Sequence, residues 1–173
     1  ILTTQSGVLN DQPYSFRLRF ENADGKAGTN PEELIAAAHS GCFSMALAFA
    51  LAASGFTADS IDAEAQVSLQ PADGGFAVTG ITLKLSAKIP NISNDQFQDI
   101  AAGAKANCPI SKALAAVWGR PLVPIDSFDI LEFGRTFDDV LTVVVGRPGV
   151  ISARYRFAGQ TRRASRRTAN VLG

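Results

Sequence analysis

The sequence has few of the residues that build metal sites and disulfide frameworks, because it holds two cysteines and one histidine among 173 residues. A tetrahedral zinc site with nitrogen and sulfur ligands would lack its fourth ligand, since only Cys42, Cys108 and His39 could contribute. We therefore expect no metal and no other cofactor.

The sequence also lacks net charge, because 16 Lys and Arg balance 16 Asp and Glu, and this balance argues against nucleic-acid binding by the whole chain. Hydrophobic residues make up 46% of the chain and charged residues 18%, which suits one compact domain with a sizeable core. No basic segment followed by an apolar stretch opens the chain, so no signal peptide is predicted and a cytoplasmic location is expected. In that reducing compartment, two cysteines are more often catalytic or core residues than a structural disulfide.

The strongest structural pattern is a long helix that begins after Asn30 and ends before Gly55. Asn30 suits the N-cap, Pro31 the first helical position, and Glu33 completes a capping-box pattern. Residues 34–53 carry no charge, which fits either a membrane span or a helix buried in the core. The run is rich in alanine and no basic cluster or aromatic belt flanks it, so we predict a buried helix and no membrane partner.

The rest of the first 117 residues predicts an α+β fold with antiparallel strands. Residues 14–20 alternate between apolar and polar side chains, as a strand does, and residues 61–70 and 76–90 are typical of a β-hairpin. Ser93 is predicted to cap a second helix, and Pro109 to begin a third, short one.

Residues 118–173 differ in composition, because all five lysines fall at or before Lys112 and nine of the eleven arginines follow it. A hairpin of residues 141–145 and 150–157 is predicted there, followed by a basic tail. Solvated charge is the favoured interpretation of that tail over binding of nucleic acid or acidic lipid. A gene read in a shifted frame is the alternative origin of this segment. The predicted division is therefore between residues 1–117 and an unmatched C-terminal segment.

The two cysteines stand in distinctive contexts, Cys42 in NPEELIAAAHSGCFSMAL and Cys108 in NCPISKAL. A reactive thiol needs a lowered pKa, and the helix predicted over 109–117 directs free N–H groups and its dipole toward Cys108. Cys42 lies in apolar company, which raises a thiol pKa, so it needs a cationic partner or a hydrogen-bond donor from elsewhere. On composition and spacing alone, the two cysteines fit a redox dithiol or ordinary core residues. The candidate partners of Cys42 are His39, Arg17 and Arg19.

Together these two motifs resemble the OsmC branch of the OsmC/organic-hydroperoxide-resistance family, as do the segments GFAVTGITLK and IPNIS between them. The resemblance covers residues 4–117 and implies an intertwined homodimer with antiparallel sheets packed around a long buried central helix. It also implies a cysteine-based peroxidase of oxidative and osmotic stress defence, which reduces organic hydroperoxides and, less well, hydrogen peroxide. In the family, the cysteine matching Cys42 becomes a sulfenic acid and then forms a disulfide with the cysteine matching Cys108. A lipoyl-type dithiol or a small thiol reduces that disulfide.

The glutamate that follows Asn-Pro in the family matches Glu32, and there it pairs with an arginine that activates the thiolate; Arg19 is the candidate for that role here. Ten residues separate Glu32 from Cys42, about 15 Å along a straight helix, so the two cannot touch within one straight helix. Either the helix breaks near Gly41, or Glu32 serves the Cys42 of the other subunit, which we favour. The resemblance further implies a family strand ahead of Ile1, so the N-terminal strand is expected to be truncated.

Specificity for alkyl peroxides is expected to come from an apolar, water-excluded pocket near Phe43, Met45 and Phe97. The alternative function is a catalytically inert binding or interaction module on the same fold. Counting free thiols after peroxide treatment distinguishes the two, because an enzyme of this kind loses both thiols of a chain together.

Overall fold

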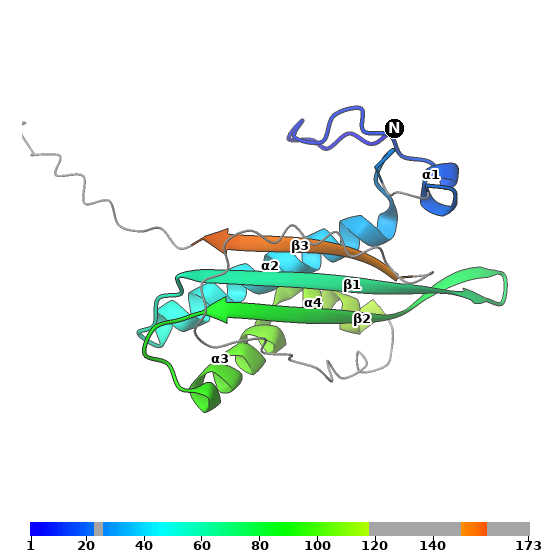
Figure 1. The fold of residues 1–173 in the computed structure, drawn as a ribbon. Helices are drawn as coiled ribbons and strands as arrows, with labels where there is room; N and C mark the ends of the chain where they lie inside the picture. The colour runs from blue at the N-terminus through cyan, green and yellow to red at the C-terminus, as the bar shows by residue number, and fades with distance from the viewer. Residues whose placement is uncertain (23–25, 118–149, 159–173) are drawn as a thin grey trace, which may run out of the picture.

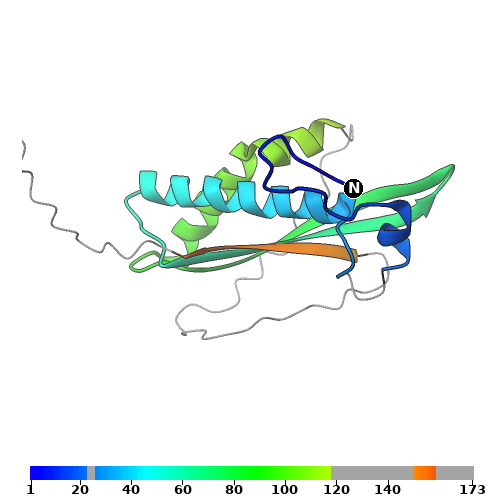
Figure 2. The ribbon, with the colours of Figure 1, turned by 90° about the horizontal axis from the view of Figure 1, so that it is seen from above.

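A three-stranded antiparallel sheet forms one layer of the molecule, and three helices cover one of its faces (Figures 1 and 2). The computed structural model describes residues 1–22, 26–117 and 150–158. The α+β class predicted from the sequence is confirmed, and the long helix α2 contacts two strands as well as both neighbouring helices. The elements are α1 (Phe16–Phe20), α2 (Pro31–Ala53), β1 (Ser60–Ala72), β2 (Gly75–Lys88), α3 (Asn94–Asn107), α4 (Pro109–Val117) and β3 (Val150–Ala158).

Helix α2 begins and ends at the residues that its sequence predicts, but the Glu33 carboxylate accepts a hydrogen bond from Thr29 Oγ1 in place of the predicted capping-box contact. The Asn30 side chain accepts a hydrogen bond of 2.9 Å from the backbone N–H of Glu33, which caps the helix. Gly55 follows the last turn with a φ of +84°, a conformation that costs glycine little. The helix is continuous through Gly41, so the predicted alternative of a break at that point is wrong.

One side of α2 is buried and the other is exposed. Phe43, Leu47 and Leu51 are at most 1% exposed, and each such burial stabilises the fold by roughly 1.5–3 kcal/mol. Met45 and Phe49 are exposed on the other side, so a single chain buries only part of the helix that the sequence predicts as buried. Among the described residues, α2 is the one helix long and apolar enough to cross a membrane, which is weak evidence because soluble core helices pass the same test.

Strands β1 and β2 form the predicted hairpin. The strands pair in antiparallel fashion from Ser60 opposite Lys88 to Ala72 opposite Gly75, and Gly74 in the turn has a φ of +83°. The apolar positions of β2 predicted to face the core are buried, while the intervening positions are half-buried or exposed. These buried positions are Ile81, Leu83 and Leu85.

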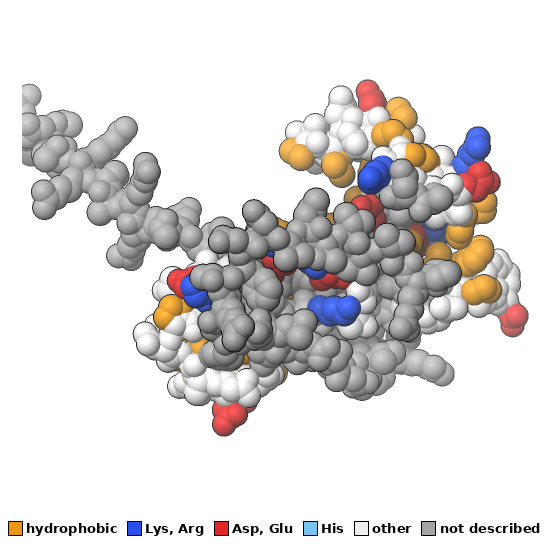
Figure 3. Space-filling model, viewed as in Figure 1, with side chains coloured by type: hydrophobic (Ala, Val, Ile, Leu, Met, Phe, Trp, Pro, Cys, Tyr) orange, Lys and Arg blue, Asp and Glu red, His pale blue; other side chains and the backbone are white. Residues whose placement is uncertain are grey.

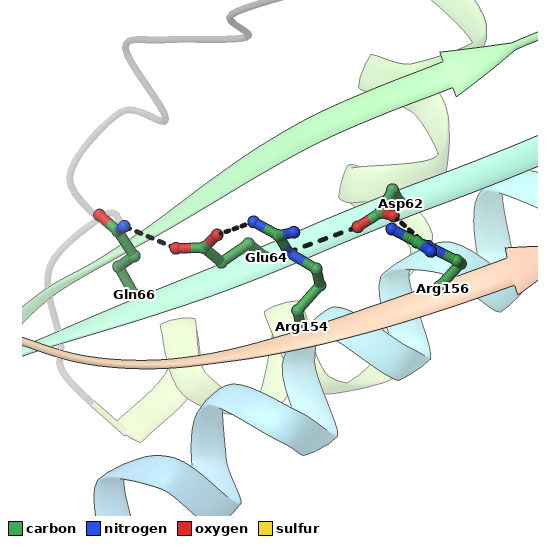
Figure 4. Close-up of polar contacts among 5 residues, drawn as sticks. All are labelled: Asp62, Glu64, Gln66, Arg154 and Arg156. Carbon is green, nitrogen blue, oxygen red and sulfur yellow. Dashed lines mark hydrogen bonds and ion pairs between the residues drawn. The ribbon is translucent and has the colours of Figure 1, made fainter. Parts of the chain in front are cut away.

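Strand β3 lies beside β1, on the side opposite β2. It confirms the second strand of the predicted C-terminal hairpin, although its partner here is β1. The predictions for residues 141–145 and 159–173 lie outside the described residues, and the division of the chain at residue 117 stays a prediction. On the face of the sheet that points away from α2, acidic side chains of β1 pair with arginines of β3 (Figure 4). The residues of this charged ladder are Asp62, Glu64, Gln66, Arg154 and Arg156.

The strand predicted over residues 14–20 is wrong, because the short helix α1 occupies most of that segment. Ser15 caps this helix by accepting a hydrogen bond from the Leu18 N–H, and Arg17 pairs with Glu21 one turn later. Among the described residues, the N-terminal segment has one isolated bridge, Leu2 with Gln12, and no neighbouring strand for 14–20. Alternation specifies a strand only where another strand supplies the pairing, and a capped helical turn satisfies the backbone here instead.

Candidate thiol site

The two cysteines meet where α2 packs against the N-terminus of α4. Cys42 lies in the middle of α2, and Cys108 lies between α3 and α4, with its carbonyl accepting the Lys112 N–H of the first turn of α4. Their sulfur atoms are 3.4 Å apart and unbonded, Cys108 being fully buried and Cys42 partly exposed. The structure therefore holds a reduced dithiol whose sulfurs can bond after a small shift.

The thiol of Cys42 receives its hydrogen-bond donor from α4. Burial raises its pKa above the ordinary value and the neighbouring Cys108 adds to the rise, while the backbone N–H of Ile110 opposes it by donating to the Cys42 sulfur. That N–H is one of the free donors at the N-terminus of α4, which were expected to point toward Cys108. None of these influences is a positive charge, so the part of the chain that the structure describes places no activating cation beside Cys42.

His39 is not the cationic partner of Cys42, and that prediction is wrong. Its ring is buried, with Nε2 2.9 Å from Ser111 Oγ of α4, and Nδ1 has no partner among the described residues. Burial, aided by the positive charge of Lys105, lowers the pKa of His39 to about 4, so the ring is neutral at physiological pH. Ser111 was missed in the sequence analysis, although it follows Cys108 by the same three residues that separate His39 from Cys42.

Arg19 and Glu32 form an ion pair at the N-terminal end of α2. Arg19 Nε donates to Glu32 Oε2 at 3.0 Å, and Arg19 Nη2 donates to Oε1, so the pairing is bidentate. The Glu32 side chain is 2% exposed, and the guanidinium satisfies a carboxylate that would otherwise be buried and unpaired. Arg17, the other candidate, is exposed and pairs with Glu21 instead.

An exposed aromatic cluster joins α1, which carries Arg19, to the tip of the β1–β2 hairpin. The rings of Phe16 and Phe20 have centroids 4.7 Å apart, and Phe20 lies 4.8 Å from Phe76 at the tip of the β1–β2 hairpin. The Arg19 guanidinium lies 5.1 Å from the centre of the Phe20 ring, a distance suited to a cation–π contact. Figure 3 shows hydrophobic side chains gathered at this end of the molecule, next to acidic and basic ones.

The predicted apolar pocket is not formed by the three residues expected to line it. Phe43 and Phe97 are packed in the core cluster, while Met45 is 59% exposed on the far side of α2. The described residues also hold no group of three or more His, Cys, Asp or Glu side chains arranged to bind a metal ion.

Comparison with known proteins places this site in a family. A family model described as OsmC-like protein matches residues 23–118. Peroxiredoxin OsmC of Escherichia coli is 54% identical over 115 residues, which cover 66% of this chain and 78% of that protein. The organic hydroperoxide resistance protein OhrB of Bacillus subtilis is 36% identical over 116 residues, covering 65% of this chain and 79% of that protein.

The fold agrees with these sequence relationships. The crystal structure of Bacillus subtilis OhrB superposes with a TM-score of 0.50 at 35% identity, covering 64% of this chain and 78% of that one. Both cysteine motifs fall inside the matched residues, and this arrangement of helices and sheet is the one that brings the two thiols together. The chain belongs to the OsmC-like protein family and is a peroxiredoxin-like enzyme of the peroxidase type.

Proposed function

We propose that this enzyme reduces organic hydroperoxides, and hydrogen peroxide less well, with Cys42 as the peroxidatic nucleophile and Cys108 as the resolving thiol. The observation that carries the proposal is the reduced dithiol, whose sulfurs lie 3.4 Å apart beside the Ile110 N–H. Cys42 is assigned the first step because it is partly exposed, whereas Cys108 is fully buried. A buried second thiol suits an internal step better than the attack on a substrate.

The proposed reaction has three steps. The Cys42 thiolate attacks one peroxide oxygen, so that an S–O bond forms, the O–O bond breaks, and the alkoxide leaves and takes a proton to become an alcohol. The Cys108 thiolate then attacks the sulfenic sulfur of Cys42, the S–S bond forms, and hydroxide leaves as water. An external dithiol, of lipoyl type, or a small thiol finally reduces the disulfide by thiol–disulfide exchange and is itself oxidised.

The proposal assigns Arg19 and Glu32 to activation of the thiolate in a homodimer. Helix α2 is unbroken, so Glu32 and the Cys42 of the same chain are about 15 Å apart along the helix axis. The ion pair is therefore assigned to the Cys42 of a second subunit. Support for a second copy comes from Met45 and Phe49, which leave an apolar strip exposed on the side of α2 next to Cys42.

The same apolar strip is proposed to favour alkyl peroxides, because it would line the approach to Cys42 once a second subunit covers it. The name of the Bacillus subtilis relative, organic hydroperoxide resistance protein, supports this choice of substrate and a role in stress defence. A cytoplasmic location belongs to the same proposal, since that compartment supplies the thiols that the third step consumes.

The test is peroxide consumption by the purified protein with a dithiol reductant, comparing cumene hydroperoxide with hydrogen peroxide. Cys42→Ser is expected to abolish consumption of both, because no other thiol is placed to attack the peroxide. Cys108→Ser is the matched control, and it should still consume one equivalent of peroxide and form a sulfenic acid that dimedone traps. Folded wild-type protein that consumes no peroxide would overturn the proposal in favour of an inert module.

A further inference from the structure

Two contacts lie close together where α2 meets the N-terminal end of α4. The first joins the Cys42 and Cys108 sulfurs at 3.4 Å, and the second joins His39 Nε2 to Ser111 Oγ at 2.9 Å. His39 precedes Cys42 by three residues and Ser111 follows Cys108 by three, and positions three apart on a helix are neighbours on one face. The hydrogen bond is thus one turn along α2 from Cys42, and it lies in the first turn of α4, which begins directly after Cys108.

We propose that His39 and Ser111 are a positioning pair that holds the N-terminus of α4 against α2. In this arrangement, the pair keeps both the Ile110 N–H and the Cys108 thiol on the sulfur of Cys42. An effect of this pair on peroxide reduction rests on the proposed function, whereas its effect on the placement of the two thiols does not.

The hydrogen bond is placed where a helix as short as α4 needs support. With nine residues, α4 is too short to be stable alone, so its orientation depends on tertiary contacts. Ile110 and Leu114 pack only partly against the core, whereas Ser111 is 6% exposed and His39 1% exposed. A buried polar group that loses its partner is costly, so the fold strongly favours keeping the two residues together.

The chemistry of the pair suits a constant geometry rather than a switch. A neutral imidazole carries one donor and one acceptor nitrogen, and a serine hydroxyl can complement either. Burial and Lys105 keep the ring neutral by lowering the pKa of His39 to about 4. The bond is therefore present in the same form throughout the pH range in which the thiols react.

The positioning can be measured without peroxide, through the pKa of Cys42 and through the equilibrium between the thiol pair and glutathione. If α4 tilts away from α2, Cys42 loses the Ile110 donor, and its pKa rises further. The thiols also separate, which disfavours the exchange in which oxidised glutathione takes two electrons from the pair and leaves one protein disulfide and two reduced glutathione molecules.

The experiment compares Ser111→Ala with Ser111→Thr and Ser44→Ala in the full chain. Ser111→Ala removes the hydrogen bond, Ser111→Thr keeps the hydroxyl, and Ser44→Ala removes a fully buried hydroxyl of α2 that has no partner among the described residues. For Ser111→Ala, we expect the disulfide-forming equilibrium constant with glutathione to fall about tenfold, the scale of one buried hydrogen bond. The other two variants should match the wild type.

The second readout is the rate at which iodoacetamide alkylates Cys42 as a function of pH, measured in a Cys108→Ser background so that one thiol reacts. Ser111→Ala should raise the apparent pKa of Cys42, and Ser111→Thr should restore it. If Ser111→Ala does not fold, as judged by circular dichroism, His39→Asn replaces it, because the shorter side chain cannot reach Ser111.

Wild-type values in Ser111→Ala would overturn the inference, as would an equal shift in Ser44→Ala. Neither readout uses peroxide, so a wild-type protein that fails to consume peroxide would sink the proposed function and leave this test unaffected. A Ser111→Ala protein that is less stable but has an unchanged glutathione equilibrium would show a structural role only.

Discussion

The middle of α2 and its N-terminal end hold the two halves of the proposed active site, and they are completed in different ways. At the middle, α4 brings Cys108 and the Ile110 N–H to Cys42 within one chain. At the N-terminal end, α1 brings Arg19 to Glu32, about 15 Å along the helix from Cys42.

The two ends of this comparison correspond to two steps of the proposed chemistry, formation of the disulfide and activation of the thiolate. The proposed disulfide joins two sulfurs of one chain, and these already lie 3.4 Å apart at the middle of α2. Burial and the second thiol both raise the pKa of Cys42, which the Ile110 N–H opposes, and the proposal assigns further activation of the thiolate to the positive charge of Arg19. In the proposed mechanism, the two halves come together only when the N-terminal end of a second subunit reaches the thiol.

The largest expected effect on peroxide consumption comes from removing the charges at the N-terminal end of α2 while leaving the thiol pair intact. Replacing both charges, Arg19→Gln with Glu32→Gln, removes the ion pair without leaving an unpaired buried carboxylate. Peroxide consumption should fall by roughly a hundredfold, the change in thiolate fraction that one nearby opposite charge produces. The glutathione equilibrium of the thiol pair should stay at the wild-type value, because the middle of α2 is untouched.

A mixture of subunits tests whether the two halves belong to different chains. The Arg19→Gln/Glu32→Gln chain is refolded together with a Cys42→Ser chain, so that mixed dimers combine one intact thiol pair with one intact ion pair. Activity above that of either chain alone is expected when the ion pair serves the thiol of the other subunit. No recovery in dimers shown to be mixed would contradict the shared site.

A smaller effect, on the stability of the fold, is expected from protonation of His39 near the middle of α2. The pKa of His39 is lowered from 6.5 to about 4 in the folded chain, so the unfolded chain binds more protons between these values. Unfolding free energy should therefore fall as pH falls from 6.5 through 4, by about 3 kcal/mol for this group. Urea unfolding at several pH values, for wild type and His39→Gln, isolates the contribution as the difference between the two pH slopes. Equal slopes would mean that His39 titrates alike in both states.

Much of the fold could be predicted from the sequence, because several elements carry their own start and stop signals. The capped α2 and the capping box of Ser93 with Gln96 at the start of α3 depend on neighbours in sequence. The strand predicted around Phe16 is wrong because its formation does not depend on neighbours in sequence alone. Its alternation matches a strand, but whether it becomes one depends on a partner strand that lies elsewhere.

Only the parts of the site that are marked by local sequence motifs could be predicted. The sequence motifs single out Cys42 and Cys108, whereas the donor that reaches Cys42 is a backbone N–H of Ile110, which no side-chain pattern reveals. The charge state of His39 follows from burial and from Lys105 on another helix, so helical position alone could not give it.

The smallest expected effect concerns β3, which supports the middle of α2 from the sheet side. The Tyr155 ring lies against Gly41, where an added Cβ would stand 3.5 Å from ring atom Cδ2, and Gly41 immediately precedes Cys42. On the other face of β3, Arg154 Nη2 donates to Glu64 Oε2 at 2.9 Å, and these two residues are paired directly across the strands. Partial burial raises the pKa of Glu64, but the hydrogen bonds and charge of Arg154, with Gln66 and Lys84, outweigh it and lower the pKa.

A double-mutant cycle of Glu64→Gln and Arg154→Gln measures what this pair contributes to holding β3 in register. We expect a coupling free energy of about 0.5–1 kcal/mol, because the Arg154 side chain is 37% exposed and solvent screens the pair. The same cycle on Arg17 and Glu21, whose side chains are 84% and 62% exposed, is the matched control and should give a smaller value. Equal couplings in the two cycles would mean that β3 is held by the packing of Tyr155 and its neighbours and by backbone pairing alone. In that case, the in-chain support of the thiol site from the sheet side would be apolar, and the charged ladder would contribute no more than an ordinary surface pair.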